Sequence, residues 1–145
     1  MSEISQVSQN GFVGDRTDEP CFCLISPSSA TGISNLPWLV FFISPDSGLP
    51  TGLGGGVGPG KATSSTPLAV NGGTHTLFIN YVGEEEDAEF TINLFCQRGD
   101  EIYSEQQITF TWGDRLETSI FNLNGGLFTL HLPTDCELRD GGEVG

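Results

Sequence analysis

The chain has very few basic residues. Five Lys and Arg stand against 19 Asp and Glu, so its 145 residues carry a formal net charge of −14 at pH 7. Acidic residues concentrate from Glu84 onward, whereas Asp46 and Lys61 are the only charged residues between positions 26 and 83. An acidic surface repels phosphate groups and anionic lipid headgroups, which disfavours direct binding to nucleic acid or to a membrane surface. A basic partner and simple solubility both remain compatible with this charge.

A long apolar run and a secretory leader are also missing. The longest apolar run, Trp38–Ile43, is far shorter than the ~20 residues of a membrane-spanning helix, so we expect no membrane insertion. Residues 1–9 contain neither a basic region nor the apolar stretch of a signal peptide. We therefore expect a protein synthesised in the cytoplasm without a signal peptide, unless a leader has been removed, with a virion as one destination.

No segment shows the apolar period of an amphipathic helix, and the clearest pattern is a period of two. From Phe90 to Cys96 every second residue is apolar, which is typical of a strand with one buried face. Residues 74–82 are also strand-like, and four consecutive acidic residues, 84–87, lie between the two segments. This arrangement predicts a β-hairpin over residues 74–96 with an acidic tip.

Similar short segments, separated by turn signals, continue to the end of the chain. We expect turns at residues 71–73, 98–100, 113–114 and 124–126. About seven or eight short strands without a helix predict an all-β fold, namely a single antiparallel β-sandwich of jelly-roll-like or immunoglobulin-like type.

The composition of the chain also predicts its organisation. Residues 1–19 form an extended N-terminal arm, residues 20–133 the β-sandwich domain, and residues 134–145 a flexible C-terminal tail. Within the sandwich, residues 48–67 are rich in Gly, Pro, Ser and Thr, which predicts a long mobile loop. Loops longer than ~12–15 residues are usually functional or disordered, so partner contact is expected there.

Two short motifs are better explained as turn or loop chemistry than as sites. Residues 55–62 match the letters of a phosphate-binding loop, but Ala62 replaces the Ser or Thr that holds magnesium and neither flank provides the strand and helix required. The sequence Arg98-Gly99-Asp100 resembles a receptor-binding triplet, yet Gly-Asp beside Arg is also ordinary turn chemistry.

Metal binding is a weak alternative for the acidic segment. Glu84, Glu86 and Asp87 are candidate calcium ligands because calcium prefers several carboxylate oxygens in a flexible loop, and Asp100 and Asp114 would join them if their loops cluster. Consecutive acids point in different directions, however, so a solvated tip that keeps an apolar hairpin from aggregating is the preferred interpretation. We expect no cofactor.

The four cysteines, Cys21, Cys23, Cys96 and Cys136, leave three alternatives open. Buried thiols acting as small hydrophobic side chains are preferred, a disulfide such as Cys23 to Cys96 comes next, and a zinc site with His75 or His131 is the weakest. Both histidines fall on expected strands, which suggests half-buried strand residues rather than a general base. With no catalytic constellation visible, we expect no enzyme.

These features favour a structural or assembly protein that acts through protein partners, most concretely an accessory virion protein such as a capsid cement or decoration subunit. The Trp38–Ile43 strand is apolar on both faces, which suggests a homo-oligomer, either a dimer or a trimer. The expected contact residues lie in the arm, on one face of this strand and in the glycine-rich loop: Phe12, Val13, Trp38, Val40, Phe42, Leu53 and Val57.

The alternative function is a carbohydrate-binding or receptor-binding adhesion module. In this hypothesis Trp38 or Trp112 stacks on a sugar ring, and the acidic loops hold calcium. A calcium-dependent melting temperature would favour it.

Overall fold

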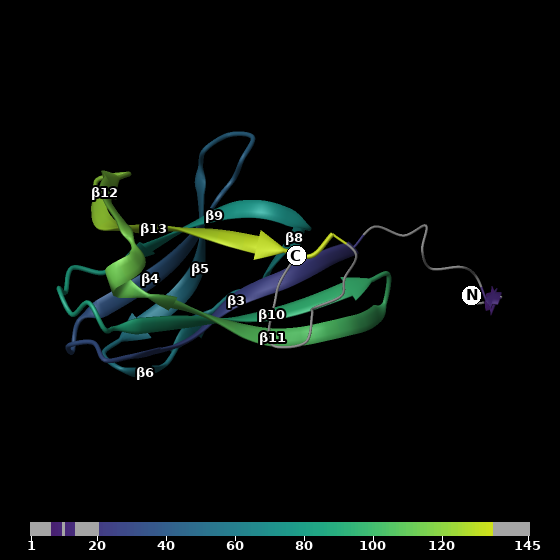
Figure 1. The fold of residues 1–145 in the computed structure, drawn as a ribbon, viewed down its shortest axis with the longest axis horizontal. Helices are drawn as coiled ribbons and strands as arrows, with labels where there is room; N and C mark the ends of the chain where they lie inside the picture. Colours follow the sequence, from purple (N-terminus) through teal and green to yellow (C-terminus); the bar gives the residue numbers. More distant parts are fainter. Residues whose placement is uncertain (1–6, 10, 14–20, 135–145) are drawn as a thin grey trace.

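Two antiparallel sheets face each other as the two layers of a β-sandwich in the computed structural model of the chain (Figure 1). The structure describes residues 7–9, 11–13 and 21–134. Its strands are β1 (Val7–Gln9), β2 (Gly11–Val13), β3 (Cys21–Thr31), β4 (Pro37–Ile43), β5 (Pro50–Val57), β6 (Gly60–Lys61), β7 (Ser64–Ser65), β8 (Leu68–Asn71), β9 (Gly73–Asn80), β10 (Glu89–Arg98), β11 (Glu101–Thr111), β12 (Leu116–Ile120) and β13 (Leu123–Leu132).

The two layers have different strand orders. One sheet runs β11-β10-β3-β6, with β8 also paired to β3, and the other runs β12-β13-β9-β4-β5-β7. We call them the five-stranded and the six-stranded sheet. A separate pair, β1 with β2, completes the described strands, and one 3-10 turn, η2 (Trp112–Asp114), leads from β11 toward β12. The prediction of an all-β antiparallel sandwich is confirmed.

Period-two alternation places the core between the sheets. Alternate residues of β3 and β10 are buried along almost their whole length, and the same alternation holds for β4. Because successive side chains of a strand point to opposite faces, each strand contributes one row to the interior. The core therefore consists of the inward rows of both sheets.

An aromatic cluster fills one end of this core. The ring centres of Phe90 and Tyr81 are 5.5 Å apart, those of Phe90 and Trp112 are 5.4 Å apart, and those of Trp38 and Phe90 are 5.8 Å apart. Each buried indole N–H has a partner, since Trp38 donates to the Gly58 carbonyl at 3.1 Å and Trp112 donates to that of Gly83 at 3.2 Å. These bonds satisfy the polar edges of side chains that are otherwise buried.

A disulfide links neighbouring strands of the five-stranded sheet. Cys23 of β3 lies directly opposite Cys96 of β10, with the Cα atoms 4.0 Å apart. Cys21 is not a free thiol either, so the preferred interpretation of buried thiols was wrong for the described cysteines. Cys136 lies outside the described residues.

The segment 74–96 is not a hairpin. Its first strand, β9, pairs with β4 and β13, whereas β10 pairs with β3 and β11 in the other sheet. The connection crosses between the layers, with Tyr81 and Ala88 buried at its two ends. A hairpin and a crossing connection both bury the apolar face of each strand, so the local pattern predicted the strands correctly and their pairing wrongly.

The predicted long loop at residues 48–67 is also wrong in large part, because it contains β5, β6 and β7. The glycines of β5 allow close backbone approach. A Cβ at Gly55 would lie 1.9 Å from the Trp38 carbonyl oxygen, and one at Gly54 would lie 2.0 Å from that of Ser64. Only residues without a side chain fit between these strands, which explains a glycine-rich sequence that is nevertheless ordered.

The turn before β13 lies earlier than residues 124–126. It is formed by Phe121 and Asn122, which have φ values of 51° and 62°. Gly125 lies inside β13, where a Cβ would be 2.1 Å from the Ile79 carbonyl oxygen. The Asn-Gly-Gly sequence therefore serves strand packing rather than the turn.

The predicted N-terminal arm and C-terminal tail fall mostly outside the described residues. Phe12 and Val13 belong to β2, but their side chains are not among those described.

Candidate functional site

The outer faces of the two sheets differ in chemistry. On the five-stranded sheet, the hydroxyls of Thr91 and Thr109 are hydrogen-bonded at 3.0 Å. Gln107 donates to the Asn93 side chain at 3.0 Å and to the Ser28 hydroxyl at 3.2 Å. The middle of this face is therefore polar, and its side chains are bonded to one another.

The outer face of the six-stranded sheet carries an apolar row instead. The strand register places Leu116, Leu127, Phe78 and Phe41 side by side across β12, β13, β9 and β4. Leu116 is 70% exposed, and Leu39, two residues before Phe41 on the same face of β4, is 41% exposed. We call this surface the apolar face.

The aromatic rings of the apolar face pack over glycines on neighbouring strands. A Cβ at Gly125 of β13 would lie 2.8 Å from Cζ of Phe78, and one at Gly52 of β5 would lie 3.8 Å from the Phe41 ring. The two ring centres are 6.1 Å apart. Phe78 is completely buried although it points outward, because it lies over Gly125 and beside Phe41. The two rings thus lie flat against the sheet rather than projecting from it.

The apolar face also lacks charge. The described outward positions of these strands hold no Asp, Glu, Lys or Arg. They are Pro37, Leu39, Phe41 and Ile43 on β4, Pro50, Gly52, Gly55 and Val57 on β5, Thr74, Thr76, Phe78 and Asn80 on β9, Leu116, Thr118 and Ile120 on β12, and Leu123, Gly125, Leu127, Thr129 and His131 on β13. In a chain of net charge −14, this neutrality distinguishes the surface from the rest.

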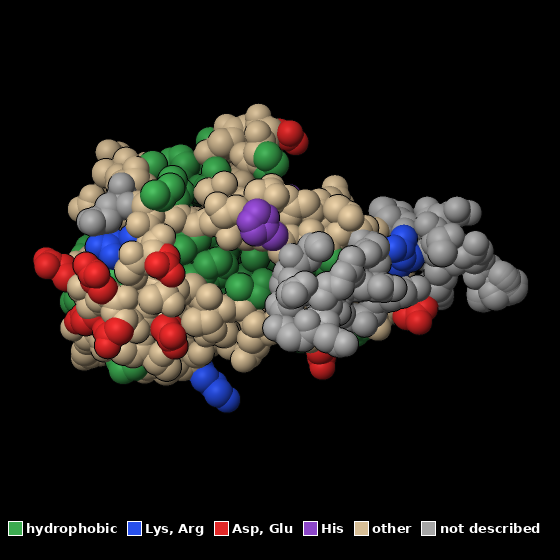
Figure 2. Space-filling view, in the orientation of Figure 1, with side chains coloured by type: hydrophobic (Ala, Val, Ile, Leu, Met, Phe, Trp, Pro, Cys, Tyr) green, Lys and Arg blue, Asp and Glu red, His purple; other side chains and the backbone are tan. Residues whose placement is uncertain are grey.

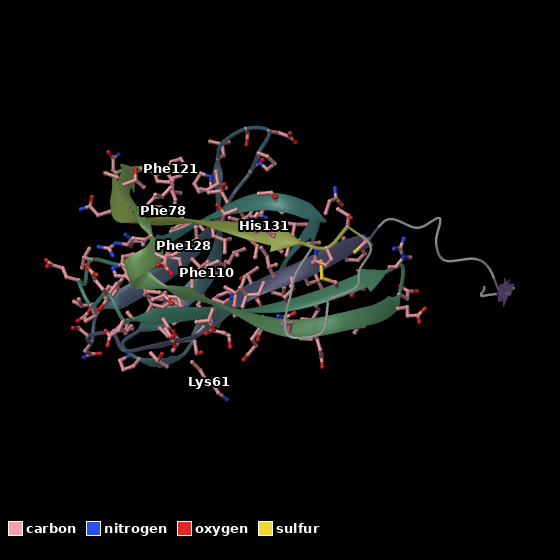
Figure 3. All side chains as sticks on the ribbon, in the orientation of Figure 1. Lys61, Phe78, Phe110, Phe121, Phe128 and His131 are labelled. Carbon is pink, nitrogen blue, oxygen red and sulfur yellow. A yellow bond between two sulfur atoms is a disulfide. The ribbon has the colours of Figure 1, made fainter. Side chains whose placement is uncertain are left out.

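A strained aromatic residue stands at one corner of the apolar face. Figure 3 shows Phe121 at the tip of the β12–β13 hairpin, with Phe78 on the same side of β13 and Phe128 and Phe110 on the inner side. Phe121 is 43% exposed and has a φ of 51°. A bulky residue in the left-handed region is disfavoured by roughly 1–2 kcal/mol, and such strain is often found at functional positions.

Acidic side chains gather instead at the end of the molecule near the β9–β10 connection and η2 (Figure 2). One of them, Glu85, is held in place. Tyr81 donates a hydrogen bond of 2.5 Å to Glu85 Oε1, and the Ser34 hydroxyl donates to Oε2. The backbone N–H of Ser34 in turn donates to the Tyr81 hydroxyl at 3.0 Å. This network fastens the crossing connection to the segment between β3 and β4.

The network shifts the ionisation of its two acids in opposite directions. Burial, and then the hydrogen bond to Glu85, raises the pKa of the Tyr81 hydroxyl above its usual 10.0. Hydrogen bonds from Ser34 and Tyr81 lower the pKa of Glu85 below its usual 4.5. Tyr81 therefore stays neutral as a donor while Glu85 stays ionised as an acceptor near neutral pH.

An open groove of about 590 Å³ lies between this network and the β12–β13 hairpin. Arg115 lines it, with the guanidinium carbon 4.6 Å from the centre of the Trp112 ring and Nη1 donating to the Trp112 carbonyl at 2.8 Å. A Cβ at Gly126 would lie 2.5 Å from that of Arg115. The arginine thus packs between η2 and β13, so its contacts connect the hairpin to the core.

Several predicted contact residues are on the wrong side of their strands. Trp38, Val40 and Phe42 point inward with exposures of 0%, 1% and 6%, and Leu53 is 1% exposed. Because these side chains belong to the core of the single chain, they are not available to a partner. Val57 is 64% exposed, as a contact residue must be.

The remaining predicted sites are not assembled. In the described part of the chain, no three His, Cys, Asp or Glu side chains lie close enough together to hold a metal ion, so Glu84, Glu86 and Asp87 form no calcium site there. Trp38 and Trp112 are at most 1% exposed and present no ring for a sugar to stack on.

Other elements of the sequence analysis have structural roles. The triplet at residues 98–100 lies at the β10–β11 turn, where Gly99 has a φ of 60°. Nε2 of His75 donates to the Asn71 carbonyl at 2.7 Å, and Nδ1 of His131 lies 3.1 Å from the Thr74 hydroxyl. No helix among the described residues is long and apolar enough to cross a membrane.

The apolar face was not predicted from the sequence, although the apolar character of one of its strands was visible. The strand at residues 38–43 was recognised as apolar on both sides, but the contact was assigned to the even positions. Charge could not identify the outward positions of the other strands, because β5, β9 and β13 carry no charged residue on either face. Phe121 has no such signal, because its φ depends on the register of β12 and β13.

Comparisons with known proteins leave the apolar face as the main guide to function, since no family model, curated protein or solved structure matches this chain.

Proposed function

We propose that the protein is a non-enzymatic structural or assembly protein that works through protein–protein contacts made by the apolar face. The observation that carries this proposal is an uncharged sheet face with exposed leucines in a strongly acidic chain. Contiguous exposed apolar surface on soluble proteins typically marks an interaction site.

The contrast between the two sheets supports a contact role. Part of the outer face of the five-stranded sheet carries mutually bonded polar side chains. The apolar residues of that face, Phe22, Leu24 and Phe95, are half-buried. The outer face of the six-stranded sheet instead exposes leucines, Leu39 on β4 and Leu116 on the edge strand β12. A partner that covers these side chains would stabilise the complex by about 25 cal/mol for each Å² of apolar area removed from water.

The more specific form of the proposal is an accessory virion protein such as a capsid cement or decoration subunit. A small β-sandwich with a contact face suits this role by analogy of fold, which is a weaker argument than the face itself. The disulfide between Cys23 and Cys96 adds support, because disulfides persist in proteins that work outside the reducing cytosol.

Site-specific photo-crosslinking in the cells that produce the protein tests the contact role. A photo-crosslinking amino acid at position 39 reports on the apolar face, and one at position 102 is the matched control because Ile102 is 60% exposed on the other sheet. We expect a discrete protein adduct from position 39 and none from position 102. The absence of an adduct at position 39, or equal adducts at both positions, contradicts the proposal.

A further inference from the structure

We infer that the partner seated on the apolar face is a second copy of this chain, and that two copies stack their six-stranded sheets face to face. This inference rests on the proposed function and names the partner.

Charge is the first argument for a second copy. Two chains of net charge −14 repel each other, so they associate only through surfaces that do not bring carboxylates together. The outer face of the five-stranded sheet carries Glu89 and Glu105, whereas the apolar face carries no carboxylate at its described outward positions. A basic partner would gain the most electrostatic binding energy from the acidic surfaces and the least from the neutral apolar face.

A projecting loop marks one border of the apolar face. Asp46 is exposed in the loop between β4 and β5, which rises from the sheet on the side where Phe78 and Phe121 are labelled (Figures 1 and 3). The area available to a second copy therefore ends at this loop.

The size of the apolar face is the second argument. Five strands about 4.8 Å apart, each roughly 25 Å long, give a face of about 600 Å² per copy. Two such faces bury about 1,200 Å² in total when each is fully covered, which is the lower bound of the range for specific interfaces. The face is therefore large enough for a dimer, and we expect a reversible one.

The relief of the apolar face suggests how the copies meet. β12 and β5 lie on opposite sides of the central strand, β9. A two-fold axis along β9 therefore places β12 of each copy over β5 of the other. β12 carries the exposed Leu116, and Phe121 follows it, whereas β5 presents the exposed Gly52 and, at its end, Val57. Bulky residues of one copy thus lie over the strand of the other that has a glycine, Gly52, at an exposed outward position.

Sedimentation equilibrium of the purified full chain tests this inference, with two variants and one control. Leu39→Glu and Leu116→Glu each put one carboxylate per copy into the contact. The control, Ile102→Glu, adds the same charge on the other sheet at a position whose exposure, 60%, lies between those of Leu39 and Leu116. Circular dichroism and thermal melting establish that each variant is folded. We expect all three variants to fold, because the substituted side chains are exposed.

We expect the unmodified chain to dimerise reversibly, with a dissociation constant that falls as salt screens the repulsion between the copies. Each variant on the apolar face should raise that constant at least tenfold, and Ile102→Glu should change it less than threefold. A chain that stays monomeric up to about 1 mM, near the weak limit of measurable association, overturns the inference. Dimers unaffected by both face variants, or weakened equally by the control, overturn it as well.

The two proposals fail separately. A monomer in sedimentation together with a crosslinked adduct of a different protein at position 39 rejects the second copy and retains the contact face. A monomer with no adduct at position 39 rejects both.

Discussion

Removing the disulfide between β3 and β10 should strongly destabilise the fold. The perturbation is the double variant Cys23→Ala with Cys96→Ala, which cuts the covalent link between two central strands. The two cysteines are 73 residues apart in the sequence, so the bond restricts about half of the unfolded chain.

The magnitude follows from this separation. Closing a loop of 73 residues lowers the entropy of the denatured chain by an amount worth about 4.4 kcal/mol at 25 °C. A protein of this size has an unfolding entropy of roughly 0.3 kcal/mol per degree, so the melting temperature should fall by about 14 °C. Both side chains are completely buried, and their truncation adds a smaller cost from the cavity.

Urea unfolding of the oxidised protein and its variants measures this loss. Ile92→Val is the matched control, because Ile92 is fully buried in β10 and the substitution removes one methyl group without changing any crosslink. The control should lose about 1 kcal/mol. The double variant should lose about 4 kcal/mol or more, with a steeper dependence on urea because its denatured state is more expanded.

A double variant no less stable than Ile92→Val would refute the reasoning. The same holds for an unchanged urea dependence together with an unchanged melting temperature, since both follow from the longer free chain.

Two further predictions concern the fold around the site. Because hydrogen bonds lower the pKa of Glu85 below 4.5 in the folded state, its stabilising effect is present above that pH and is lost as the pH falls through the lowered value. Thermal melts of Glu85→Gln between pH 6 and about pH 3 should therefore show a flatter acid limb than those of the unmodified protein, and parallel limbs contradict the assignment. In β13, Gly125→Ala would place a Cβ 2.1 Å from the Ile79 carbonyl oxygen, so denaturation should show a loss of about 3 kcal/mol. The control Gly52→Ala, with its nearest contact at 3.8 Å, should change stability by less than ~1 kcal/mol, and equal effects would show that the backbone gives way.

The sequence predicted strands well where one face is apolar. The alternation from Phe90 to Cys96 reappears as the burial pattern of β10. The prediction was wrong at β5. A glycine-rich sequence is the same whether the segment forms a loop or a strand whose backbone approaches its neighbours closely. The difference depends on neighbours such as Trp38 and Ser64, which are distant in sequence.

The candidate site shows the same division. The two-sided apolar character of β4 was visible in the sequence, but which side faces the core was not. Trp38 was predicted to contact a partner but lies in the interior of the sandwich. Leu39 was not predicted as a contact residue but lies on the exposed outer face. Alternation separates the two faces of a strand but does not say which face points to the core, because that depends on where the second sheet packs.

The sequence by itself determined the fold class, the acidic character of the molecule and the segments able to form strands, because these depend on composition and on local periodicity. Only the tertiary structure decided that β9 and β10 belong to different sheets, that Cys23 meets Cys96, and that Phe41 and Phe78 share a neutral outer face. Each of these relations joins residues whose proximity arises from strand pairing across long stretches of chain, and no local pattern encodes such a pairing.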